Sequence, residues 1–176
     1  WKAWWEKEED GFAIISPEDL EKRAEEEETR RLKQISAVSF FGIRIISHRV
    51  IFIIDVSGSM NEVCRPIYVG DQGEPRIDVA KRELAKAIEG LDPAALYNIV
   101  HFSSDVSGWL DGGVAGASDK SRDEALEFVS RLAATGATNL YGAIKHAFED
   151  PDVDTIYILG DGEPTAGEVV DPHQIR

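Results

Sequence analysis

The clearest pattern in the chain is an apolar run over residues 50–54 that ends at an aspartate. This run contains no polar position, so it predicts a strand buried on both faces, as in a parallel sheet. Residues 155–160 form a second buried run, which is also followed by an aspartate. Between the two runs, apolar residues recur at helical spacing over residues 77–91. Strands and helices therefore alternate, which predicts an α/β fold: a Rossmann-like, doubly wound, mostly parallel sheet flanked by helices.

Weaker patterns predict the remaining elements. Residues 38–46 are rich in aromatic and β-branched side chains and predict one short strand, with a bend or bulge at Gly42. Residues 95–103 predict another strand, and the short connection to residues 106–110 predicts that this segment pairs antiparallel with it. Further patterns predict a loop over residues 61–75 and helices over 118–133 and 139–149.

The first 36 residues differ in character from the rest. Ser16 and Pro17 have the types expected at a helix start, and a charged helix follows them. The tryptophans at positions 1, 4 and 5 share one helical face that needs a cover. We interpret the glutamates at 25–28 as a solvated helix surface. Residues 1–36 are thus predicted to be a connector or the end of a preceding domain, and residues 37–176 the main domain.

Composition narrows the classes of partner. The 176 residues carry 33 acidic and 19 basic side chains, a net charge of −14, which disfavours nucleic acid and anionic membranes. Cys64 is the single cysteine, so no internal disulfide is possible. No stretch reaches the roughly 18 to 20 apolar residues needed to insert across a bilayer. The chain starts with Trp rather than Met, and localisation and oligomeric state stay open.

Oxygen-bearing side chains follow the first apolar run at alternate positions: Asp55, Ser57 and Ser59. Gly58 allows a sharp turn, so these side chains can face one point. A carboxylate and two hydroxyls suit a magnesium-like cation and not zinc, and the four histidines lack the spacing of a zinc site. Asp161 follows the second run, as expected at the switch point of a doubly wound sheet, where ligands bind.

Three segments in order carry a family resemblance: Asp55-Val-Ser-Gly-Ser59, Gly136-Ala-Thr-Asn139 and Asp161-Gly-Glu-Pro-Thr165. Over residues 38–176 the chain resembles a von Willebrand factor type A domain. The resemblance implies a metal-ion-dependent adhesion site for Mg²⁺, with Mn²⁺ or Ca²⁺ as alternatives. It implies hydroxyl ligands from Ser57, Ser59 and Thr138, with Asp55 and Asp161 acting directly or through water. The family continues through further strands and a closing helix, so the resemblance implies that the C-terminal part of the domain is missing here. Either the chain is a piece of a larger, multidomain protein, or another segment covers the remaining edge of the sheet.

The predicted function is a metal-dependent protein-binding module. Two carboxylates balance the dication, and an open coordination position accepts an Asp or Glu of a partner protein. One alternative is a metal that only clamps the loops together. Another is a magnesium-dependent phosphatase of the haloacid dehalogenase type, but Ser57 stands where that chemistry needs a second acid. A serine hydrolase is disfavoured because the G-x-S-x-G turn is missing. The sequence therefore predicts no enzyme.

Overall fold

The computed structural model describes residues 16, 19–20, 22–23, 39–64, 73–151 and 153–175. The chain divides into two compact units, Trp1–Ile35 and Ser36–Arg176. In the first unit, the backbone N–H of Asp19 donates to Ser16 Oγ at 3.0 Å. This is the capping hydrogen bond expected where the predicted helix begins. The predicted tryptophan face and acidic run lie outside the described residues, as do residues 65–72 of the predicted loop.

A five-stranded sheet forms the centre of the second unit. β3 (Arg49–Asp55) lies between β4 (Leu96–Phe102) and β7 (Thr155–Leu159) and runs parallel to both. β5 (Val106–Gly108) and β6 (Ala115–Gly116) pair antiparallel with β4. The parallel centre and the antiparallel hairpin were both predicted. The sequence predicted one antiparallel strand and missed β6, because two residues are too few to show an alternation.

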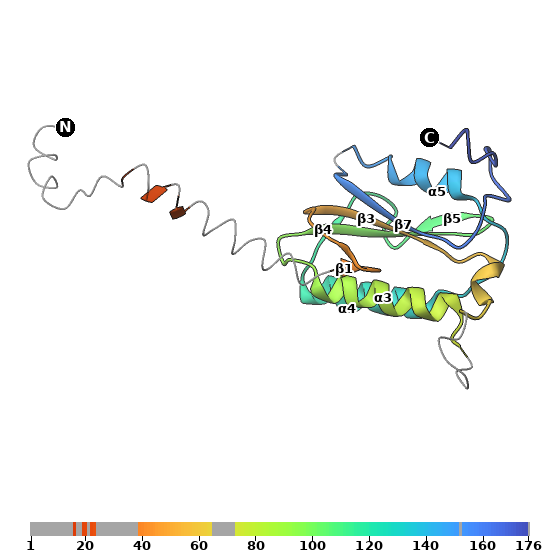
Figure 1. The fold of residues 1–176 in the computed structure, drawn as a ribbon, viewed down its shortest axis with the longest axis horizontal. Coiled ribbons are helices and arrows are strands. Elements are labelled where there is room, and N and C mark those ends of the chain that lie inside the picture. The colour runs from red at the N-terminus through yellow and green to blue at the C-terminus, as the bar shows by residue number, and fades with distance from the viewer. Residues whose placement is uncertain are drawn as a thin grey trace, which may run out of the picture. The chain divides into compact units, whose positions relative to one another are not determined.

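Helices cover both faces of this sheet, so the fold is doubly wound as predicted. α3 (Arg76–Gly90) and α4 (Asp119–Arg131) lie on one face, and α5 (Leu140–Ala147) lies on the other (Figure 1). Within the described part of the chain, every helix is too short or too polar to span a bilayer.

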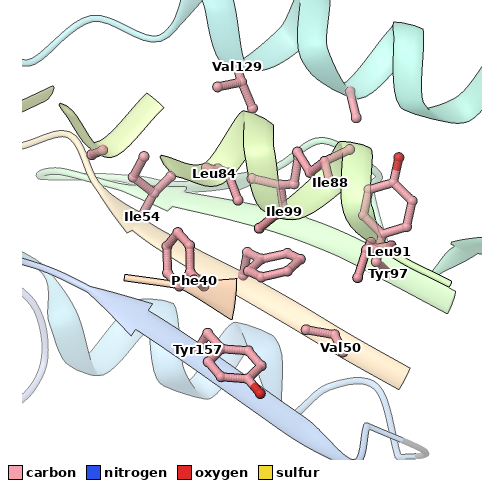
Figure 2. Packing of buried hydrophobic residues seen from close by; sticks show 14 of the residues in the cluster. Phe40, Val50, Ile54, Leu84, Ile88, Leu91, Tyr97, Ile99, Val129 and Tyr157 are labelled. Atoms are coloured by element: carbon pink, nitrogen blue, oxygen red, sulfur yellow. The ribbon is translucent and has the colours of Figure 1, made fainter. Parts of the chain in front are cut away.

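Alternate residues of β3 enter two hydrophobic cores. Val50, Phe52 and Ile54 face α3 and α4 and pack with residues such as Leu84, Ile88 and Val129 (Figure 2). Ile51 and Ile53 face α5 and pack with its alanines, Ala143 and Ala147. Burial on both faces explains why this strand has no polar residue between Arg49 and Asp55. The two cores hold the end of the strand in a defined place.

The prediction of one strand over residues 38–46 was wrong. The segment is a tight hairpin, in which β1 (Ser39–Phe40) pairs antiparallel with β2 (Ile43–Arg44). Phe41 and Gly42 form its turn, with φ angles of 50° and 77°. Two consecutive positive φ angles are typical of the turns that join hairpin strands, and a non-glycine residue seldom adopts the first of them. The bend predicted at Gly42 is therefore a complete reversal of the chain.

Candidate metal site

Asp55 ends the central strand and is fully buried, at 0% exposure. Its Oδ1 accepts a hydrogen bond of 2.7 Å from the backbone N–H of Ser57. Its Oδ2 is buried and accepts no hydrogen bond of ordinary geometry from the described residues. A side-chain carbon at Gly160 would lie 3.2 Å from this oxygen, so the glycine keeps the space beside it free. This buried carboxylate oxygen thus has no hydrogen-bond donor of ordinary geometry beside it among the described residues.

The surroundings of Asp55 disfavour its negative charge. Burial raises the pKa of its carboxyl group, and the nearby Asp161 carboxylate raises it further. A hydrogen bond from Ser57 acts in the opposite direction, and so does the nearby backbone N–H of Asp161, which does not reach ordinary hydrogen-bond geometry. The two offset only part of the effect. A cation beside Oδ2 would reverse the balance, because it stabilises the ionised form.

A chain of close oxygen contacts leads away from Asp55. The Oγ atoms of Ser57 and Ser59 lie 3.1 Å apart, and Ser59 Oγ donates to Asp161 Oδ1 at 2.8 Å. The short helix η2 (Gly58–Asn61) makes the turn that aligns the two serines, and its buried residue Met60 anchors it in the core. The ends of β3 and β7 are thereby joined through side-chain oxygens.

Thr138 reaches the same group of loops through its backbone. Its N–H donates to Thr165 Oγ1 at 3.0 Å, and its carbonyl accepts from the N–H of Thr165 at 2.9 Å. Two residues earlier, the carbonyl of Gly136 accepts from the N–H of Gly58 at 2.9 Å. The loop that holds Thr138 is therefore fastened to both strand ends, and the threonine itself is buried. The five predicted residues come from three segments that contact one another.

Arg76 was missed by the sequence reasoning. It is the first residue of α3, and its guanidinium forms a very short ion pair with Asp161 Oδ2. The same group lies 3.0 Å from Glu62 Oε2 and 3.4 Å from the carbonyl of Ser59. The Asp161 carboxylate raises the pKa of Arg76, so the side chain stays charged. No sequence signal distinguishes Arg76 from the other cationic residues of this helix.

The donor set fits a hard divalent cation. Two carboxylates and three hydroxyls supply only oxygen, which Mg²⁺ prefers, whereas Zn²⁺ prefers nitrogen and sulfur. The described residues contain no group of three or more His, Cys, Asp or Glu side chains arranged to hold a metal. Any cation here would depend on the hydroxyl groups and on the unpartnered oxygen of Asp55. That oxygen is the feature of the site that most plainly fits a cation.

Comparison with known proteins agrees with this architecture. The sequence model of the von Willebrand factor type A domain matches residues 48–174. The chain belongs to this family. It is 30% identical over 135 residues to the inter alpha-trypsin inhibitor, heavy chain 4, of Mus musculus. It is 29% identical over 122 residues to von Willebrand factor A domain-containing protein 3A of Homo sapiens. These alignments cover 70% and 68% of the chain, but only 13% and 9% of the two relatives.

Two solved structures share the fold of this von Willebrand factor type A domain. A von Willebrand factor type A protein from Catenulispora acidiphila is 27% identical, with a TM-score of 0.50 over 62% of this chain and 25% of the other. The PilB minor pilin from Streptococcus sanguinis is 21% identical, with a TM-score of 0.54 over 74% of this chain and 36% of the pilin. The pilin comparison shows a common fold and nothing further.

Proposed function

We propose that this domain binds a divalent cation, in the first place Mg²⁺, and that the cation coordinates an Asp or Glu carboxylate of a partner protein. Ser57, Ser59 and Thr138 would supply hydroxyl oxygens, and Asp55 and Asp161 would supply carboxylates. Mn²⁺ and Ca²⁺ are alternative ions, because similar sets of oxygen ligands accept them. When bound, the ion supplies a positive centre with an open coordination position for an anionic ligand.

The observation that carries the proposal is the buried Oδ2 atom of Asp55, which accepts no hydrogen bond of ordinary geometry from the described residues. An unsatisfied buried acceptor costs about 1–3 kcal/mol, and more when it is charged. Natural structures seldom keep such a group without a use. A cation would satisfy the atom and would turn a destabilising feature into a ligand.

The charges of the chain and of the site favour a carboxylate as the group with which the partner binds the ion. The chain has a net charge of −14, so an acidic partner would ordinarily be repelled. At the site, a dication offsets Asp55 and Asp161, and the serines and threonine add no charge. An incoming carboxylate would then meet a local positive centre within an acidic surface. The interaction should therefore depend on the ion.

We infer an interaction module and not an enzyme. A phosphatase that uses an aspartate nucleophile needs a second acid nearby to protonate the leaving group. Ser57 occupies that position, and its hydroxyl is within hydrogen-bond distance of Ser59 at 3.1 Å. A serine hydroxyl is too weak an acid for this role. Membership of the von Willebrand factor type A family also favours the interaction module.

The test is titration calorimetry on protein freed of metal with EDTA. Wild type should bind Mg²⁺ and Mn²⁺, whereas Asp55→Ala should lose binding. The matched control is Asp111→Ala, which removes an exposed carboxylate elsewhere in the second unit. Equal uptake of ion by wild type and Asp55→Ala would show that the site is wrongly assigned. With a partner in hand, binding that ignores both EDTA and loss of the partner's acid would reduce the metal to a structural clamp.

A further inference from the structure

The two carboxylates of the candidate site are held differently. Both oxygens of Asp161 are engaged, Oδ1 by Ser59 and Oδ2 by the guanidinium of Arg76. Asp55, in contrast, keeps its Oδ2 without a hydrogen bond from the described residues. A cation that binds here finds one carboxylate open and the other already neutralised by a positive side chain.

We propose that Arg76 is a built-in competitor for the cation, which holds Asp161 until a divalent ion displaces it from that carboxylate. The inference rests on the proposed function, since it assigns a regulatory residue to the same site. A guanidinium and a divalent ion are both attracted to a carboxylate, and one Asp161 oxygen cannot fully serve both. A divalent ion that binds here therefore replaces the guanidinium of Arg76 at Asp161.

Arg76 has the means to leave Asp161. A second carboxylate, that of Glu62, already lies 3.0 Å from its other terminal nitrogen and is 66% exposed. The Arg76 side chain is 34% exposed and lines a cavity of about 250 Å³, together with Phe41, Leu159 and Asp161. Glu62 and the cavity therefore offer places toward which the guanidinium can turn. The ion pair with Glu62 would keep it close to the site.

The exchange has two opposite effects on binding. Arg76 weakens the attraction of the site for a cation, because it lowers the negative potential at Asp161. It strengthens the attraction of the loaded site for an anion. The two carboxylates and a dication sum to zero. Arg76 adds one positive charge, which the exposed carboxylate of Glu62 offsets only in part because water screens it. Arg76 would therefore lower the affinity of the site for the ion and raise the affinity of the loaded site for an acidic ligand.

The size of the first effect follows from the repulsion between the guanidinium of Arg76 and the incoming dication. Even when water screens it, repulsion between these charges over a few ångströms changes an affinity by about tenfold or more. Removal of Arg76 should therefore strengthen ion binding by at least about tenfold.

The experiment titrates Mn²⁺ alone into EDTA-stripped wild type, Arg76→Gln and Arg82→Gln. Arg82 is the matched control, because it lies on the same helix and pairs with Glu74 at 2.6 Å, outside the candidate site. Arg76→Gln should bind Mn²⁺ at least about tenfold more tightly than wild type. Arg82→Gln should bind like wild type.

Two additional measurements separate competition from a structural role. Arg76→Gln should unfold at a lower temperature than wild type in EDTA, because it lacks the ion pair, yet gain more from Mn²⁺. Arg76→Lys keeps a charge but cannot contact Asp161 and Glu62 through two separate nitrogens. Its Mn²⁺ affinity should therefore lie between those of wild type and Arg76→Gln. Arg76→Lys can also replace Arg76→Gln in the Mn²⁺ titration if Arg76→Gln does not fold.

The outcomes distinguish this inference from the proposed function. If wild type binds Mn²⁺ and neither Arg76 variant binds it more tightly, Arg76 is no competitor and the inference is overturned. An equal gain in Arg82→Gln would also overturn it, since the effect would then come from the net charge. If no protein binds Mn²⁺, the proposed function itself fails.

Discussion

Replacement of Asp55 by asparagine should stabilise the metal-free domain and abolish its response to Mg²⁺. Asparagine has nearly the same shape, and its side-chain oxygen can still accept the 2.7 Å hydrogen bond from the N–H of Ser57. The change removes a negative charge from a position with 0% exposure. Stability and ion binding should therefore move in opposite directions in this variant.

The magnitude follows from the state of the second oxygen. A buried acceptor without a partner costs about 1–3 kcal/mol, and a charged one costs more. The asparagine amide that replaces Oδ2 is itself a donor without an evident acceptor, so part of the gain is lost. We expect a net rise of about 1–2 kcal/mol in the free energy of unfolding at pH 7. For a domain of this size, that corresponds to roughly 3–6 °C in the melting temperature.

The effect should depend on pH in a defined direction. Because burial raises the pKa of Asp55, the folded protein binds this proton more tightly than the unfolded chain does. The penalty on wild type is therefore absent below the unfolded value of 3.8 and grows as the pH rises through the folded pKa. The advantage of Asp55→Asn should be small near pH 4 and fully developed well above the folded pKa.

Urea unfolding followed by circular dichroism can measure this difference in EDTA at both pH values, and again in saturating Mg²⁺. Asp111→Asn is the control, because it removes one exposed charge from a chain of net charge −14 without touching the site. If Asp55→Asn is less stable than wild type in EDTA at pH 7, the reasoning about the unpartnered oxygen is refuted. An equal gain in Asp111→Asn would attribute the effect to net charge.

Two further predictions concern the frame around the site. Leu84→Ala removes a fully buried side chain of α3 and should lower the free energy of unfolding by about 2–5 kcal/mol, as measured with urea in EDTA. Lys86→Ala, which is exposed on the same helix, should stay within about 0.5 kcal/mol of wild type, and a similar loss in both would contradict the packing. Burial lowers the pKa of His101, so its contribution to stability is present above the unfolded value of 6.5 and is lost as the pH falls toward the folded pKa. Lowering the pH from 7.5 to 5 should thus destabilise wild type more than His101→Gln, as measured by urea unfolding at both pH values. Parallel losses would disprove a half-buried neutral histidine.

The sequence by itself determined the parallel centre of the fold and the positions of the two candidate carboxylate ligands after its strands. Five apolar residues in succession can be buried only where both faces of a strand are covered, and the helical spacing after them identified a covering helix. Asp55 ends β3 and Asp161 follows the neighbouring parallel strand β7, so their meeting at one edge of the sheet followed from topology. These features were readable because each rests on a local pattern, either a run of apolar residues or an aspartate that follows such a run.

The tertiary structure alone decided which groups satisfy one another. Arg76 and Asp161 are separated by 85 positions, and their contact depends on where the start of α3 lies relative to the loop after β7. Phe41 adopts a positive φ because the hairpin must reverse there, although its residue type favours a strand. The unpartnered oxygen of Asp55 is likewise visible only once every neighbouring donor has its place. Periodicity reports whether a residue is buried, whereas the partner of a charge depends on distances between segments that the sequence does not encode locally.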